Sequence, residues 1–77
     1  MSNQSIEQSI RESLEGYFRD LDGETPNDVY DMVIRLVEKP LLEVVMNHAD
    51  NNQSRAADWL GLNRNTLRKK LIEHQML

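Results

Sequence analysis

The chain has 77 residues, no cysteine and a net charge of −4. Residues 1–77 are expected to form one small domain, and such a domain buries only about 60% of its unfolded surface, so a lone copy is marginal without a partner. The lack of cysteine excludes disulfides and thiolate metal sites and suits a reducing cytoplasm. No apolar run approaches the roughly 20 residues needed to span a membrane, and the N-terminus does not resemble a signal peptide.

The charges are divided unevenly along the chain. Residues 1–50 hold eleven acidic and four basic residues, a net charge of −7, whereas residues 51–77 hold two acidic and five basic residues, a net charge of +3. This asymmetry predicts a basic C-terminal end that faces an anion and an acidic end held away from it.

A first amphipathic helix is predicted from Ser5 to about Leu21. Ser5 and Gln8 fit a capping box at its start, and Asp22 and Gly23 fit a helix stop. The apolar residues recur at intervals of three and four and form one stripe. They are Ile6, Ile10, Leu14, Tyr17, Phe18 and Leu21.

A second helix is predicted over about residues 26–48, with Thr25 as N-cap and Pro26 in the first turn. It is apolar over so much of its circumference that more than one neighbour must bury it. The other short helices can hardly do so alone, and we therefore expect a second copy to cover the rest in an intertwined homodimer. A monomeric four-helix bundle is the alternative. Residues 5–48 would form the dimerisation unit, with an interface of Val33, Ile34, Val37, Leu41, Val44 and Val45.

Pro40 lies in the middle of this second helical pattern. Proline removes one helical hydrogen bond and clashes with the preceding turn, so the helix either stops near Lys39 or continues with a kink. The apolar phase is the same before and after the proline, which favours a long kinked helix.

Residues 52–75 show the pattern of a helix-turn-helix. Asn52 and Asn63 are suitable N-caps for two short helices, and Gly61 between them suits a left-handed turn. Ala57, four residues before the glycine, permits two helices to cross closely. The apolar positions of the two helices are Ala56, Ala57, Leu60, Leu67 and Leu71, with Leu62 plugging the turn. In such a unit the second helix enters the major groove of DNA.

The polar side of the second short helix is basic. Arg64 and Arg68 align on a helical wheel, and Asn65 and Lys69 lie beside them. Arginine can bond guanine in a bidentate fashion, and lysine can neutralise phosphate. The caps, the glycine, the alanines and this basic side occur together, and their combination predicts binding to double-stranded DNA.

The chain resembles the Fis family of small dimeric nucleoid proteins that bend DNA. The resemblance covers roughly residues 6–77 and is carried by two stretches, NQSRAADWLGLNRNTLRKKL (52–71) and DVYDMVIRLVEKPLLEVVM (28–46). The C-terminal run is also similar to the C-terminal domains of NtrC-type activators, which carry it behind a large ATPase domain. The resemblance implies an all-α fold of four helices per subunit, a place in the cytoplasmic nucleoid, and a role in transcription regulation and chromosome organisation.

The resemblance also implies roles for individual residues. Asn63 and Arg64 would lie nearest the base edges, with Arg64 recognising guanine. The two recognition helices would lie too close together for straight B-DNA, so the duplex would bend. The phosphate-binding residues would be Asn52, Ser54 and Arg55 at the first short helix, and Thr66, Arg68, Lys69 and Lys70 along the second.

Some positions depart from the family pattern. Only about five residues precede the first predicted helix, where the best-known members have a longer arm that contacts a recombinase, so recombinase contact is not expected. Asp50 and Asn51 stand where those members use a basic residue and glycine to touch RNA polymerase, and that contact is left open. Ile72 replaces a usual basic residue.

The remaining polar residues indicate no catalysis, cofactor or metal site. His48 and His74 are expected at helix ends or on the surface, and Trp59 is expected to pack against the central helix. Two alternatives to a Fis-type dimer remain. One is an NtrC-type DNA-binding module standing alone, and the other is a helical protein-interaction module that does not bind DNA.

Overall fold

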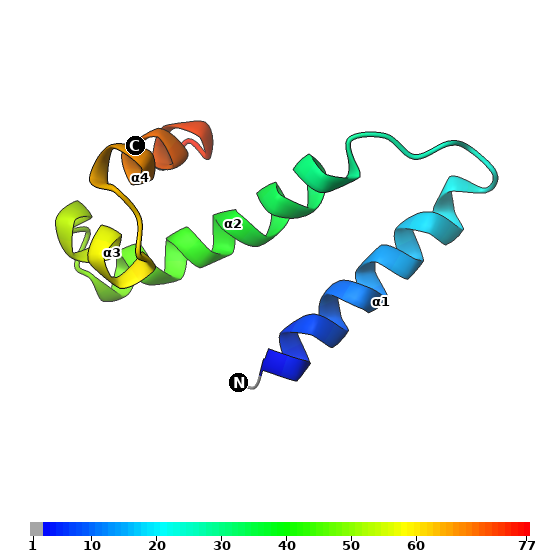
Figure 1. Ribbon diagram of the computed structural model, residues 1–77, viewed down its shortest axis with the longest axis horizontal. Coiled ribbons are helices and arrows are strands. Elements are labelled where there is room, and N and C mark those ends of the chain that lie inside the picture. The colour runs from blue at the N-terminus through cyan, green and yellow to red at the C-terminus, as the bar shows by residue number, and fades with distance from the viewer. Residues whose placement is uncertain (1–2) are drawn as a thin grey trace.

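A computed structural model describes residues 3–77 of the chain, and these form four helices and no strand. The helices are α1 (Asn3–Leu21), α2 (Val29–His48), α3 (Gln53–Leu60) and α4 (Arg64–Glu73). Helices α1 and α2 run antiparallel, while α3 and α4 gather at the far end of α2 (Figure 1). The shape is elongated, 45 × 27 × 16 Å. The all-α fold with a C-terminal helix-turn-helix is confirmed.

Helix α1 begins earlier than its sequence pattern predicts. It starts at Asn3, so Ser5 lies inside the helix and its predicted role as N-cap is wrong. Helix ends shift readily by one or two residues because polar residues such as these tolerate a first turn. Residues 1 and 2 of the predicted N-terminal segment lie outside the described residues. The predicted stop is confirmed, because Asp22 and Gly23 both have positive φ, at 49° and 91°.

Helix α2 begins later than predicted and continues through Pro40. Asp28 adopts a left-handed conformation (φ 50°, ψ 31°), which a right-handed helix cannot include, so Thr25 and Pro26 remain in the loop and do not cap α2. The first helical hydrogen bond runs from the Met32 amide to the Asp28 carbonyl. The helix then includes Pro40 and reaches His48, which confirms the continuous helix; the kink at the proline stays a prediction.

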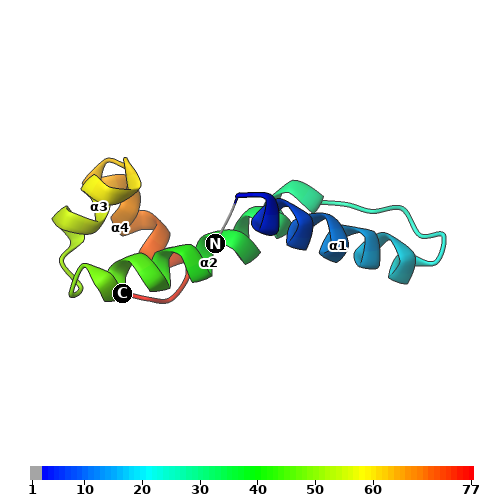
Figure 2. The ribbon, with the colours of Figure 1, turned by 90° about the horizontal axis from the view of Figure 1, so that it is seen from below.

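The buried core lies at one end of the molecule, where the C-terminal half of α2 meets α3 and α4. Helix α1 contributes no buried residue. Seen from below, α3 and α4 lie at one end of α2, and α1 lies toward the other end (Figure 2). The core consists of Leu42, Met46, Ala49, Ala56, Ala57, Leu67 and Leu71.

The two sides of α2 differ sharply in burial. Leu42 is 1% exposed and Met46 is also buried, because both face the helix-turn-helix of the same chain. Of the predicted interface residues, Val45 packs partly against this core, whereas Val44 lies on another side of α2 and is 58% exposed. Large apolar side chains left exposed on α2 are Tyr30, Ile34, Leu36, Val37, Leu41 and Val44. One chain therefore covers only part of its central helix. Within the described residues, no helix is long and apolar enough to cross a membrane.

Candidate nucleic-acid interface

The first short helix, α3, is capped as the sequence predicts. The Asn52 Oδ1 atom accepts a hydrogen bond from the Arg55 amide at 3.0 Å. This bond satisfies one of the amides that a helix start leaves without a helical partner. Ser54 and Arg55 are exposed in the first turn, and the Arg55 guanidinium lies 3.8 Å from the carboxylate of Asp50. The start of α3 thus presents short polar groups and one loosely paired cation to solvent.

The turn between α3 and α4 has the geometry that its glycine requires. Gly61 has φ 74° and ψ 28°, and the Leu62 amide donates to the Ala57 carbonyl at 2.9 Å. A Cβ at Gly61 would meet no atom within 4 Å, so space does not require glycine here. Glycine is favoured because it adopts the left-handed conformation without strain. Ala56 and Ala57 are buried under this turn, as the sequence predicts.

The entrance of α4 brings two predicted DNA-binding residues together. Asn63 caps the helix, and its Oδ1 accepts from the Asn65 amide at 2.8 Å. Arg64 is the first helical residue, and its side chain is exposed. The cap therefore holds Arg64 at the end of α4 where the positive pole of the helix lies.

One side of α4 is apolar and the other is basic. Leu67 and Leu71 are buried in the core, and this packing turns the opposite side to solvent. Across residues 3–77, no ion pair engages Arg64, Arg68 or Lys69. Five predicted binding residues of α4 are exposed: Arg64, Asn65, Thr66, Arg68 and Lys69. Guanidinium and ammonium groups that are exposed and not ion-paired can contact phosphates or base edges without first breaking an ion pair within the protein.

Lys70 lies elsewhere. Its Nζ is 2.8 Å from the Glu38 Oε2 atom on α2, and its side chain is 30% exposed. The Glu38 Oε1 atom lies 2.9 Å from the His74 Nε2 atom. Because a carboxylate only accepts, His74 donates through its Nε2–H. The structure thus places Lys70 on the side of α4 that packs against α2, apart from the basic side.

Glu38, Lys70 and His74 form a charged cluster that we call the α2–α4 clamp. The hydrogen bond from Lys70 holds the pKa of Glu38 below its ordinary value of 4.5, against the opposing effect of burial. The same bond raises the pKa of Lys70 above 10.5. Both charged forms are therefore favoured in the folded chain.

One expectation for an individual side chain is confirmed and another is corrected. His74 lies at the end of α4, as expected, and its side chain is 5% exposed and bonds Glu38. Trp59 does not pack against α2 and is 58% exposed, since the inner side of α3 is occupied by Ala56, Ala57 and Leu60. In the part of the chain that the structure describes, no group of three or more metal-ligating side chains occurs.

The clamp was missed by the sequence analysis although its residues follow helical spacing. Glu38 precedes Leu42 by four residues on α2, and Lys70 precedes His74 by four on α4. On a helical wheel Lys70 lies on the side of Leu67 and not beside Lys69. This periodicity was the available signal.

These features define a helix-turn-helix protein, and comparison with known proteins identifies its family. A family described as bacterial regulatory protein, Fis family, matches residues 33–74. A relative from Ralstonia nicotianae, named as a Fis-like DNA-binding protein, is 64% identical over 77 residues, the whole of both chains. One of the same name from Neisseria meningitidis serogroup A is 61% identical over 72 residues, 94% of this chain and 91% of the relative. DNA-binding protein Fis of Actinobacillus succinogenes is 45% identical over 76 residues, 99% of this chain and 77% of that protein.

The chain belongs to the Fis family. The family is one of regulatory proteins and not of enzymes, in agreement with the prediction that the chain has no catalytic function.

The clamp predicts how stability depends on pH. The lowered pKa of Glu38 means that its contribution is present above 4.5, the ordinary value, and is lost as the pH falls through the folded-state pKa. The raised pKa of Lys70 means that its contribution is present below 10.5 and is lost as the pH rises through the folded-state pKa. The difference in unfolding free energy between wild type and Glu38→Gln should be largest between these limits and shrink at both ends. Urea unfolding at a series of pH values measures it.

The matched control is Glu43→Gln, which removes an exposed carboxylate from the same helix. It should change the unfolding free energy little across the pH range, because exposed charges are solvated in both states. A Glu38→Gln difference that stays constant with pH would contradict the role of the ion pair.

Proposed function

We propose that this chain is a homodimeric protein that binds and bends double-stranded DNA, regulates transcription and organises the chromosome in the cytoplasmic nucleoid. Residues 5–48 would form the dimerisation unit and residues 52–75 the DNA-binding unit, within one domain. The observation that carries the proposal is an exposed basic side on α4, free of ion pairs, attached to a central helix that one chain leaves partly uncovered.

The proposal for DNA rests on the chemistry of α4 and on the family. Arg64, at the capped entrance, is assigned to guanine, with Asn63 and Asn65 beside it. Phosphate contacts are assigned to exposed residues at two helix starts and along α4, namely Asn52, Ser54, Arg55, Thr66, Arg68 and Lys69. Relatives with 64% and 45% identity are named as DNA-binding proteins. Lys70 is left out of this set because Glu38 already neutralises it.

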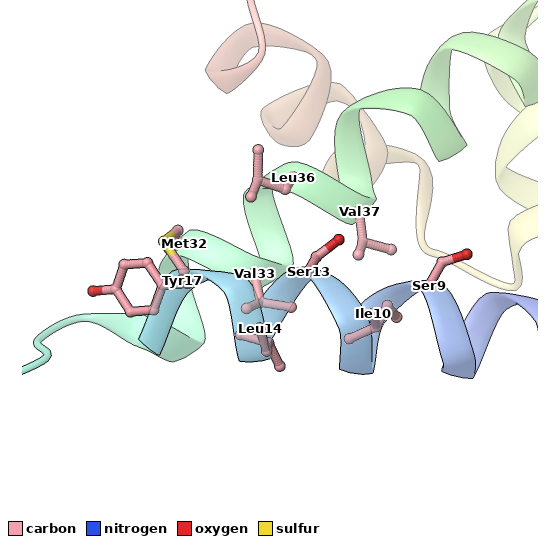
Figure 3. A pocket seen from close by; sticks show the side chains of 9 residues that line it. All are labelled: Ser9, Ile10, Ser13, Leu14, Tyr17, Met32, Val33, Leu36 and Val37. Atoms are coloured by element: carbon pink, nitrogen blue, oxygen red, sulfur yellow. The ribbon is translucent and has the colours of Figure 1, made fainter. Parts of the chain in front are cut away.

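The proposal for a homodimer rests on uncovered apolar surface. A groove of about 330 Å³ lies between α1 and α2. In Figure 3, Leu14 of α1 lies beside Val33 of α2, and Ile10 lies near Val37. Outside the groove, Leu41 and Val44 of α2 are also exposed. Apolar surface of this extent is unfavourable in water, and a second copy offers the matching apolar surface.

The proposal for bending follows from the family alone. If the two recognition helices of a dimer lie closer together than successive major grooves of straight B-DNA, both can bind only when the duplex curves. The cost of that deformation depends on the DNA sequence, so part of the sequence preference would come from deformability.

Separate roles for Arg64 and Lys69 predict different binding defects. Arg64→Ala should remove a base contact, costing about 1–3 kcal/mol per half-site and flattening the preference at that base pair. Lys69→Ala should weaken binding to all sequences alike and lower the salt slope by about 1 per contact, so about 2 per dimer. Binding isotherms on a site library at several salt concentrations measure both quantities.

Ile72→Ala is the control, because it shortens an exposed neutral side chain on the same helix. It should leave the sequence profile and the salt slope unchanged. If Arg64→Ala and Lys69→Ala changed the profile and the slope identically, the division of roles would be wrong.

Dimerisation predicts that stability depends on protein concentration. The thermal midpoint should rise with concentration, because association stabilises the folded state by mass action. Val44→Asp should lower the midpoint strongly, although in a lone chain Val44 is already 58% exposed and would accept a charge at little cost. Asn47→Asp, which adds the same charge at another exposed position of α2, should have a small effect. A midpoint that does not change with concentration, together with the mass of one chain in ultracentrifugation, would refute the dimer.

Bending is tested with a set of duplexes of equal length that carry one binding site at different positions. The complex should migrate slowest when the site is central, because a bend there shortens the end-to-end distance most. Equal mobility for all site positions would show binding without bending.

A further inference from the structure

The α2–α4 clamp joins the central helix to the recognition helix through one carboxylate. Glu38 binds Lys70 at 2.8 Å with one oxygen and His74 at 2.9 Å with the other. The Glu38 side chain is only 16% exposed. Both oxygens of a largely buried carboxylate are thus occupied by donors from α4, one helical turn apart.

Two attachment points on successive turns limit how α4 can move. Leu67 and Leu71 of α4 also lie in the core with Leu42 and Met46 of α2, and apolar packing is non-directional. Hydrogen bonds are directional and weaken steeply when misaligned. Burial of Leu67 and Leu71 turns the basic side of α4 to solvent, and the two bonds to Glu38 restrict the helix further, because a small rotation that the apolar packing tolerates would misalign both bonds. The clamp therefore narrows the range of rotations open to the basic side.

We propose that Glu38 is a positioning residue for the recognition helix and that Lys70 belongs to this clamp instead of the phosphate-binding set. This inference rests on the proposed DNA-binding function. The clamp fixes the direction in which Arg64 and Arg68 point, and it withholds the charge of Lys70 from the DNA. Adjacent lysines of α4 thus have opposite roles: Lys69 faces phosphate, and Lys70 holds the helix.

The first test compares the two lysines in the same DNA-binding assay. Lys69→Gln should lower the salt slope by about 1 per subunit and leave the sequence profile unchanged. Lys70→Gln should leave the salt slope unchanged and flatten the profile, because α4 loses one of its two attachments. A Lys70→Gln variant with the salt slope of Lys69→Gln and a wild-type profile would overturn the proposal, since Lys70 would then bind phosphate.

The second test releases Lys70 by changing its partner. Glu38→Gln should raise affinity for random duplex, raise the salt slope by up to about 1 per subunit, and lower the ratio of specific to random binding several-fold. Adding Lys70→Gln to this variant should abolish the gain on random duplex but keep the loss of specificity. The control is Glu43→Gln, which removes one exposed negative charge from α2 and should preserve the ratio. An equal ratio in Glu38→Gln and Glu43→Gln would overturn the proposal.

A third measurement needs no DNA. In Glu38→Gln, amide hydrogen exchange should accelerate along α4 and stay at the wild-type rate in the N-terminal half of α2, whereas Glu43→Gln should leave both unchanged. Unchanged exchange along α4 would contradict the clamp. If wild-type protein does not bind DNA at all, the proposed function fails, and this measurement still decides whether Glu38 holds α4.

A misfolded Glu38→Gln variant is recognised by its circular dichroism, and Glu38→Asp then replaces it. Aspartate keeps the charge but is one methylene shorter, so it can bind one donor of α4 and not both. It should accelerate exchange along α4 and lower the specificity ratio without raising the salt slope, because Lys70 remains paired. Wild-type exchange and specificity in Glu38→Asp would overturn the two-point attachment.

Discussion

The rest of the structure depends on a single helix that must bury two sides. Leu42 and Met46 of α2 pack into the helix-turn-helix of the same chain, where they form the centre of its core. Val37, Leu41 and Val44 lie outside this core and are 40%, 48% and 58% exposed. Within residues 3–77, no other helix covers them fully. Hydrophobic burial supports the proposed association, and in that dimer folding stability and assembly would be coupled.

Helix α2 would link the proposed assembly to DNA recognition. The side of α2 that holds Leu42 also holds Glu38, and Glu38 bonds Lys70 of α4 and His74 at its C-cap. Because α2 continues through Pro40, both sides belong to one helix. In the proposed dimer, the second copy fixes the position of α2, and α2 fixes both the position and the rotation of the recognition helix. The spacing of the two basic sides is then set by packing, which is the property that a DNA-bending protein requires.

Local signals predict most of this fold. The caps at Asn52 and Asn63 and the left-handed Gly61 each depend on a few neighbouring residues, and all are confirmed. The start of α2 was misplaced because a left-handed Asp28 overrides the helix-starting preference of Thr-Pro. Helical spacing indicated which sides of α2 and α4 hold Glu38 and Lys70 but not that the two residues pair, because they lie 32 residues apart and meet only through tertiary packing. The division of the binding residues between base contacts and phosphate contacts stays a prediction. It depends on the geometry of a complex with DNA, which the chain alone does not determine.

The most direct test of the two-sided helix is an isotope-filtered NOE experiment on a mixture of ¹³C-labelled and unlabelled chains, which detects only contacts between copies. The account predicts contacts between copies from the methyl groups of Val37, Leu41 and Val44. It predicts none from Leu42, which is 1% exposed and already enclosed by its own helix-turn-helix. An absence of contacts between copies, or contacts that arise from Leu42 instead of Val44, would contradict the account.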